Sequence, residues 1–212
     1  MSVTVRPASL EDLPSLTEIQ NHYVIHTHIT FDVRPFTPEQ RVPWFHEHSD
    51  GKRYRLLAAC DSPAGVLGYV CTGRHRTKEA YDTTVEASIA CRPDAVGQGL
   101  GTLLYGALFD AIADQDIHRI VAGIAQPNVA SNALHRRFGF TTIGVFSQVG
   151  RKFEKYWDVM WMERPLKLPG VGYLLHSGDP YRLWSASEPT AAHLTRDLYG
   201  TGSTTTACCT RR

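Results

Sequence analysis

Hydrophobic side chains recur with two different periods up to about residue 165, and each period predicts one kind of element. After the capping sequence that begins at Ser9 they return every three or four residues, which predicts a helix with one buried face. In residues 83–91 they alternate, which places Val85 and Glu86 on opposite faces of a strand. By the same criteria we expect strands at 3–7, 55–60, 66–72, 83–91, 119–124, 142–148 and 157–163. We expect helices at 9–23, 37–48 and 130–138, and a further one with an apolar face at Leu103, Leu104, Ala107, Leu108, Ala111 and Ile112.

The order of these elements predicts an α/β domain with a mixed sheet and helices on both of its faces. The polar and basic segment 74–82 is expected to be a loop. After Lys167, glycines and prolines interrupt every regular pattern, and residues 200–210 are rich in Gly, Ser and Thr. We therefore expect one domain at 1–167 and a C-terminal extension at 168–212 that is partly disordered.

Composition narrows the class of protein without identifying it. The 212 residues are 42% hydrophobic and 20% charged, which is ordinary for a globular domain. A formal net charge of +1 gives no reason to expect nucleic acid or an anionic membrane as a partner. The first residues lack an apolar signal core and no run is long enough to span a bilayer, so we expect a cytoplasmic protein.

Cysteine and histidine patterns give little sign of a disulfide framework or a metal site. The five cysteines include no Cys-x-x-Cys pair, and their odd number argues against a set of disulfides. Among the ten histidines, His22 and His26 have one-turn helical spacing, but the Glu of the zinc-protease pattern does not follow His22. We expect ordinary polar packing of these histidines and no metal.

The most informative segment is a turn with three glycines at alternate positions, Gly97, Gly99 and Gly101, between a strand and a helix. Glycines let the backbone approach a ligand, and the free N–H groups at a helix start favour a phosphate. A plain tight turn would have the same spacing. The dinucleotide-binding fingerprint needs a glycine where Thr102 stands, and no Gly-Lys-Ser/Thr follows, so neither of those nucleotide loops is favoured.

The flanking residues carry a resemblance to a known family. Residues 80–88, Ala-Tyr-Asp-Thr-Thr-Val-Glu-Ala-Ser, followed by the glycine turn, resemble the GCN5-related N-acetyltransferases. Within that superfamily they are similar to the branch that acetylates phosphinothricin and methionine sulfone or sulfoximine. Further matching segments are Asn21-His22-Tyr23, 126–128 with 134–140, and 149–153 with 157–159. One departure is Val96, which stands where the family signature usually begins with Arg or Gln.

The resemblance implies a GNAT-type sheet, mixed but mostly antiparallel, with splayed central strands. It also implies acetyl-CoA as co-substrate and no metal. The diphosphate of acetyl-CoA would lie on the backbone of Gly97, Gln98, Gly99, Leu100, Gly101 and Thr102. The pantetheine arm would pair with Ile89, Ala90 and Cys91, whose N–H groups could also stabilise an oxyanion. Asn128 would bond the same arm or simply cap its helix.

Two residues are candidates for proton transfer. Glu86 is the expected general base, directly or through a water, because a carboxylate on a mostly apolar strand should have a raised pKa. On the residues alone, a solvent-facing strand position fits Glu86 as well. Tyr105, one turn into the helix after the glycine turn, is expected to protonate the departing thiolate; packing of an aromatic ring on the sheet is the alternative.

The resemblance also implies a small amine substrate with an acidic group. Arg76, Lys78 and Tyr81 would hold its carboxylate or phosphinate, although a solvated basic loop would look the same. Ser88 and Phe31 would line the acceptor pocket, and Lys152 and Phe153 would lie at its rim or in a dimer contact.

We expect an enzyme that acetylates the α-amino group of phosphinothricin, methionine sulfoximine or methionine sulfone. Such a reaction would confer resistance to the compound. Relatives commonly form homodimers, and we expect one here. The alternatives are the same chemistry on a protein N-terminus or a polyamine, and a non-catalytic module that binds acyl-CoA.

Overall fold

The computed structural model describes residues 3–48, 52–61 and 65–167. The extension expected at 168–212 lies outside the described residues, so its partial disorder stays a prediction.

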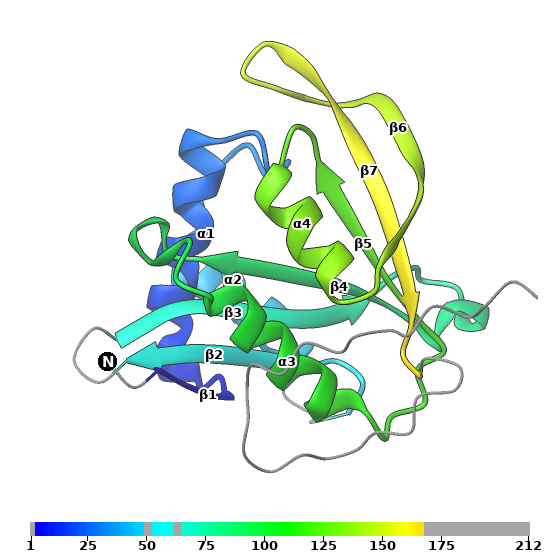
Figure 1. Ribbon diagram of the computed structural model, residues 1–212. Helices are drawn as coiled ribbons and strands as arrows, with labels where there is room; N and C mark the ends of the chain where they lie inside the picture. The colour runs from blue at the N-terminus through cyan, green and yellow to red at the C-terminus, as the bar shows by residue number, and fades with distance from the viewer. Residues whose placement is uncertain (1–2, 49–51, 62–64, 168–212) are drawn as a thin grey trace, which may run out of the picture. The chain divides into compact units, whose positions relative to one another are not determined.

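A seven-stranded sheet forms the centre of the domain (Figure 1). Its strands, in chain order, are β1 (Val3–Pro7), β2 (Leu56–Asp61), β3 (Gly65–Arg74), β4 (Thr84–Cys91), β5 (Arg119–Ala125), β6 (Thr141–Lys152) and β7 (Lys155–Pro165). In space they follow the order β1-β2-β3-β4-β5-β7-β6. Every neighbouring pair is antiparallel except β4 and β5. This confirms the predicted mixed, mostly antiparallel sheet.

The two parallel strands in the middle of the sheet separate soon after they meet. β4 and β5 pair only from Thr84 opposite Arg119 to Glu86 opposite Val121. Beyond that point β4 continues to pair with β3 on its other edge, as far as Cys91 opposite Gly68. Beyond Glu86, the edge of β4 that faces β5 is therefore unpaired within the described strands, which confirms the predicted splay.

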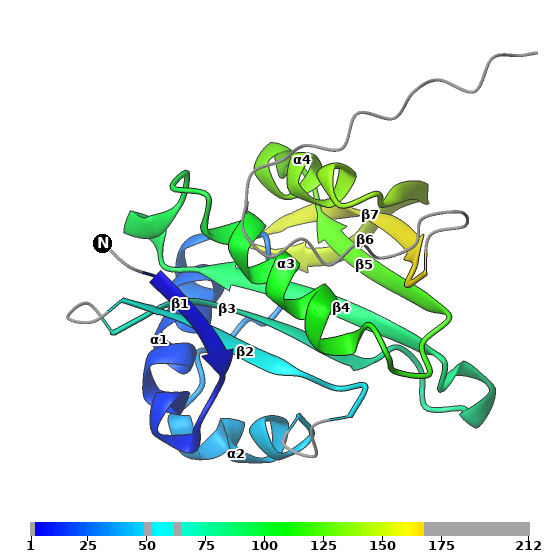
Figure 2. The ribbon, with the colours of Figure 1, turned by 60° about the horizontal axis from the view of Figure 1, so that its bottom comes forward.

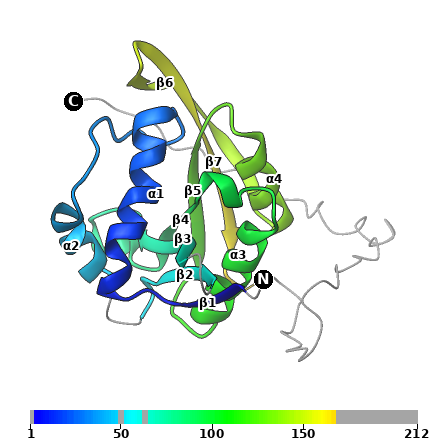
Figure 3. The same ribbon diagram turned by 90° about the vertical axis from the view of Figure 1, so that its left-hand side faces the viewer.

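Helices cover both faces of the sheet. The α-helices are α1 (Leu13–His26), α2 (Pro38–His46), α3 (Leu100–Ile112) and α4 (Val129–Arg137). Short 3-10 turns occur at η1 (Leu10–Asp12), η2 (Glu79–Tyr81) and η3 (Pro93–Ala95). Viewed along the sheet, α1 and α2 lie on one side and α3 and α4 on the other (Figure 3). None of the helices in the described ranges is long and apolar enough to cross a membrane.

Side chains of β4 point alternately to the two faces of the sheet, so this strand contributes to the core on both sides. Val85 and Ala87 belong to the core cluster formed with α3, whereas Ala90 packs against the cluster formed with α1. Figure 2 shows α3 running across the strands on the first of these faces. Glu86 therefore points to the α1 side, as the alternation predicted.

The buried face of α3 is rotated from the one expected. Leu104, Leu108 and Ile112 are fully buried as predicted, but Leu103 is 41% exposed. Tyr105 and Phe109 take its place in the core. The apolar surface of this helix is wide enough for either side to be buried, so only its packing against the sheet decides which side is.

Candidate active site

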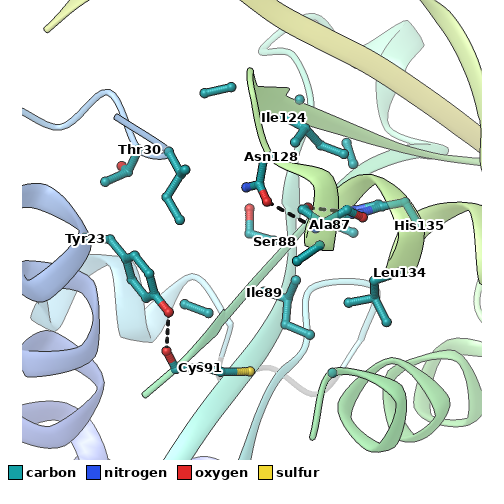
Figure 4. A pocket seen from close by; sticks show the side chains of 18 of the residues that line it. Tyr23, Thr30, Ala87, Ser88, Ile89, Cys91, Ile124, Asn128, Leu134 and His135 are labelled. Carbon is teal, nitrogen blue, oxygen red and sulfur yellow. Dashed lines mark hydrogen bonds between the residues drawn. The ribbon is translucent and has the colours of Figure 1, made fainter. Parts of the chain in front are cut away.

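A cavity of about 720 Å³ opens where β4 and β5 separate (Figure 4). Most of the predicted site residues line it, namely Phe31, Glu86, Ser88, Ile89, Ala90, Cys91, Gly97, Gly99, Leu100, Gly101 and Asn128. Six do not line it: Arg76, Lys78, Tyr81, Gln98, Thr102 and Tyr105. The unpaired edge of β4 thus leads from the glycine turn to Glu86 within one cavity.

The glycine turn needs glycine for two different reasons. Gly97 and Gly99 have φ angles of +85° and +81°, in the left-handed region that L side chains rarely adopt. No heavy atom would lie within 4 Å of a Cβ at either position, so the backbone faces open space. Gly101 instead permits close packing, because a Cβ there would lie 2.9 Å from Leu134 Cδ2 on α4. The Gln98 side chain donates to the carbonyl of Asp94 (3.0 Å).

Across the cavity, a tyrosine of α1 bonds to the end of β4 that is farthest from β5. The Tyr23 hydroxyl donates to the carbonyl oxygen of Cys91 at 2.5 Å (Figure 4). Asn128 begins α4, and its side-chain oxygen accepts from the N–H of Ser131 (3.1 Å). Asn128 is therefore an N-cap, one of its two predicted roles, and it also lines the cavity.

Glu86 occupies a partly buried position beside basic groups. Its side chain is 35% exposed and lines the cavity. Burial raises the pKa of this carboxyl group, while His75 and the charge of Arg76 act in the opposite direction. A carboxylate with a raised pKa binds a proton more readily near neutral pH, which suits a general base.

The three predicted acid-binding residues lie outside the cavity lining. Arg76 and Lys78 are exposed, and Tyr81 is 44% exposed in η2. Arg76 is near enough to lower the pKa of Glu86. The structure thus associates Arg76 with the candidate base, and it does not bring Lys78 or Tyr81 into the cavity wall.

Tyr105, the second candidate for proton transfer, is buried beneath the cavity and does not line it. This side chain is fully buried in the aromatic core, and its hydroxyl bonds His135 Nε2 at 2.7 Å. Burial also raises the pKa of the phenol, which makes it a weaker acid. A group bound in the cavity would meet His135, which does line it, before Tyr105. The packing alternative, an aromatic ring against the sheet, describes Tyr105 better.

His135 is a lining residue that the sequence analysis did not assign to the site. Its Nδ1 lies 2.7 Å from the carbonyl of Ser131, which can only accept, so Nδ1 carries the hydrogen and Nε2 accepts from Tyr105. Burial lowers the pKa of His135 and favours this neutral form. Its place in segment 134–140, which carries part of the family resemblance, was the available signal.

Replacing Tyr105 with Phe is expected to lower the free energy of unfolding by about 1–3 kcal/mol, because His135 Nε2 would lose its donor in the core. We expect kcat to change by less than about tenfold, since the hydroxyl does not reach the cavity. Denaturant unfolding and initial rates measure the two effects, with Tyr156→Phe, at a 62% exposed position, as the control. A large loss of kcat with unchanged stability would restore the acid role.

The wall opposite β4 is held by the end of the β6–β7 hairpin. Phe31 lies against Gly150, where a Cβ would overlap its ring. Lys152 is 4% exposed, and its Nζ donates to the carbonyls of Thr30 (2.8 Å) and Tyr23 (3.4 Å). His28 stacks on Trp157 with ring centroids 4.0 Å apart. These contacts fix the segment that carries Phe31.

Metal-ligating side chains do not gather in this region. Across residues 3–48, 52–61 and 65–167, no group of three His, Cys, Asp or Glu side chains is arranged to hold a metal ion.

Curated proteins with similar sequences include several acetyltransferases. The chain is 53% identical over 165 residues to a phosphinothricin N-acetyltransferase of Streptomyces coelicolor; the match covers 77% of this chain and 96% of that protein. It is 37% identical over 163 residues to an L-methionine sulfoximine/L-methionine sulfone acetyltransferase of Pseudomonas aeruginosa, covering 77% of this chain and 94% of that protein.

Solved structures share the fold. A GNAT superfamily phosphinothricin acetyltransferase from Sinorhizobium meliloti, in complex with acetyl-CoA, has a TM-score of 0.73 and 30% identity, covering 78% of this chain and 89% of that chain. An acetyltransferase from Salmonella typhimurium with its cofactor acetyl-CoA has a TM-score of 0.74 and 32% identity, covering 81% of this chain and 98% of that chain.

The splayed sheet and these similarities show that the protein is an N-acetyltransferase. The sequence model of the family described as the acetyltransferase (GNAT) domain matches residues 2–141 of this chain. The chain belongs to this family.

Proposed function

We propose that this protein transfers the acetyl group of acetyl-CoA directly to the α-amino group of a small amino-acid analogue. The candidates are phosphinothricin, methionine sulfoximine and methionine sulfone, which the curated relatives carry in their names. One observation carries the proposal: Glu86, the unpaired edge of β4 and the glycine turn line a single cavity.

The residues present fit acetyl-CoA. The backbone at Gly97 and Gly99 faces open space, and N–H groups at a helix start attract a diphosphate. The edge of β4 at Ile89–Cys91 does not pair with β5, and apart from the Cys91 carbonyl, which Tyr23 already bonds, it offers donors and acceptors to the amide groups of a pantetheine arm. When bound, acetyl-CoA supplies an activated acetyl group as a thioester.

The chain's own contribution to the reaction is proton removal and orientation. An ammonium group has no lone pair, so the amine must lose a proton before it attacks a carbonyl carbon. We assign that proton to a carboxylate oxygen of Glu86, directly or through a water. N–H groups of the β4 edge would donate to the acetyl oxygen as negative charge develops there. The C–S bond would then break, and the leaving thiolate would take up the second proton that the nitrogen loses as the amide forms.

The acceptor would bind between the basic loop and Phe31. Arg76 would contact its acidic group, with Lys78 and Tyr81 further out, and Ser88 and Phe31 would form the wall. Acetylation removes the positive charge of the amine. An analogue altered in this way no longer resembles a free amino acid, so the reaction would confer resistance.

A panel of amines assayed for thiol release from acetyl-CoA tests the proposal. We expect turnover of at least one of the three analogues and little with polyamines or peptides. If only a polyamine or a protein N-terminus is acetylated, the substrate belongs to that class and not to the amino-acid analogues. Binding of acetyl-CoA without transfer to any amine would support the non-catalytic module instead.

Replacing Arg76 with Ala is expected to raise KM for the amino-acid substrate about tenfold, since a charge-assisted contact of about 1.4 kcal/mol would be lost. KM for acetyl-CoA should not change, so initial rates with each substrate varied in turn provide the measurement and its internal control. A fall in kcat with an unchanged KM for the amino acid would mean that Arg76 acts through Glu86 and not on an anion.

We also propose a homodimer formed through the β6–β7 hairpin. Its exposed apolar side chains are Ile143, Val145, Phe146, Val149, Phe153 and Tyr156. β6 is an edge strand, and two copies of an edge can pair around a twofold axis. Sedimentation should give twice the chain mass; a monomer at micromolar concentration would contradict it.

We also propose a cytoplasmic location. Among the described residues, the three cysteines Cys60, Cys71 and Cys91 are free thiols, as is usual in a reducing compartment.

A further inference from the structure

His75, a residue with no part in the proposed reaction so far, lies beside the candidate base because of the register of β3 and β4. Glu86 is directly opposite Gly73. His75 follows two residues later, immediately after the end of β3 at Arg74. Gly73 has no side chain, and the imidazole approaches the carboxylate, with Nδ1 3.7 Å from Glu86 Oε2.

The surroundings of His75 hold its ring in this position. Tyr81 and Trp161 pack edge-on against it, with centroid distances of 6.0 Å and 5.8 Å and interplanar angles of 77° and 74°. Its side chain is 15% exposed, and Nδ1 is buried without a hydrogen bond to any described residue. A buried ring nitrogen without a hydrogen bond is costly, and the nearest acidic group is the Glu86 carboxylate.

We propose that His75 is a positioning residue for Glu86: its Nδ1–H faces the carboxylate, keeps it ionised and directs it into the cavity. This inference rests on the proposed function, in which Glu86 is the base. It assigns a partner to His75 Nδ1, which is buried and has no hydrogen bond to any described residue. It also explains how a carboxylate in a partly buried position stays charged enough to take a proton.

The charged and titratable groups around His75 and Glu86 determine in which direction the pKa of Glu86 moves when His75 is replaced. Arg76 follows His75 in the loop, and its charge lowers the pKa of Glu86, as His75 does. Cys71 of β3 has a pKa raised to about 12 by burial, so it is neutral in any assay buffer. Tyr81 faces His75 from η2, and His48, after α2, lies near Gly73. Without His75, burial acts on Glu86 with less opposition, so the pKa of its carboxyl group rises further.

The pH dependence of kcat/KM tests the inference. A base works when it is ionised, so the acidic limb of the profile follows the pKa of Glu86. His75→Phe keeps the ring packing and removes the nitrogen; we expect its acidic limb to move to higher pH by about one unit, equal to a tenfold loss of rate at a fixed acidic pH. His75→Gln retains an N–H donor and should restore much of the shift. The Kd for acetyl-CoA should be the same in all three proteins.

Direct titration of the Glu86 carboxyl group by carbon NMR, with Glu86→Gln to assign its signal, gives a second readout that needs no turnover. An unmoved acidic limb and an unmoved carboxyl titration in both His75 variants would overturn the inference and leave Glu86 as the base. Full activity of Glu86→Gln would overturn the base assignment and this inference together. Failure of every amine in the panel, with the carboxyl titration still shifted in His75→Phe, would overturn only the proposed function.

Discussion

Replacing Glu86 with Gln is expected to lower kcat by about 10²–10⁴-fold, the range typical of a lost general base. Gln has nearly the same shape but cannot accept the amine proton. The Kd for acetyl-CoA, measured by calorimetry, should not change, because the glycine turn and the free edge of β4 remain. In the unaltered enzyme kcat/KM should rise with pH as Glu86 ionises, and burial, which raises its pKa, moves that rise toward neutral pH.

Glu39→Gln is a suitable control, because Glu39 lies in the first turn of α2 and does not line the cavity. Its kcat should equal that of the unaltered enzyme. If Glu86→Gln retains most of its kcat at every pH, the proton is removed elsewhere, and the amine then reaches the site already neutral or another group is the base.

Replacing Gly99 with Val is expected to weaken acetyl-CoA binding by more than tenfold. A β-branched residue in the left-handed region is strained by about 1–2 kcal/mol or more. Its side chain would also project into the open space in front of the turn, where the diphosphate is proposed to lie. Calorimetry with acetyl-CoA measures the affinity, and thermal unfolding measures the strain.

The variant Gly65→Val is the control that separates the effect of backbone strain from the effect on acetyl-CoA binding. Gly65 has φ +73°, also with no atom within 4 Å of a Cβ, but it begins β3 and does not line the cavity. Both variants should lose similar stability, and only Gly99→Val should lose affinity. Equal affinity in the two variants would show that the turn does not bind the diphosphate.

The pattern of side chains was enough to predict each α-helix and strand, because helical and alternating periods reflect burial within one element. It also predicted that Glu86 and Val85 face opposite ways. The hairpin of β6 and β7 is longer than expected, since residues near its end have exposed positions that follow neither period. Segment 74–82 contains the turn η2, too short for a periodic signal.

Relations between elements could not be predicted in this way. The periodicity of α3 predicted Leu103 on the buried face, but the packing of the helix on the sheet buried Tyr105 and left Leu103 exposed. The contact of His75 with Glu86 depends on the register of two strands, and the bond between His135 and Tyr105 depends on the approach of two helices.

The sequence by itself determined the elements, the glycine turn and a carboxylate on the correct face of its strand, because these follow from local conformation and from the burial of apolar side chains. Only the tertiary structure decided which groups share the cavity: Glu86 and His135 line it, while Tyr105 and the basic loop do not. The physical reason is that distances across the fold arise from strand register and from the close packing of helices on the sheet, which no single segment encodes.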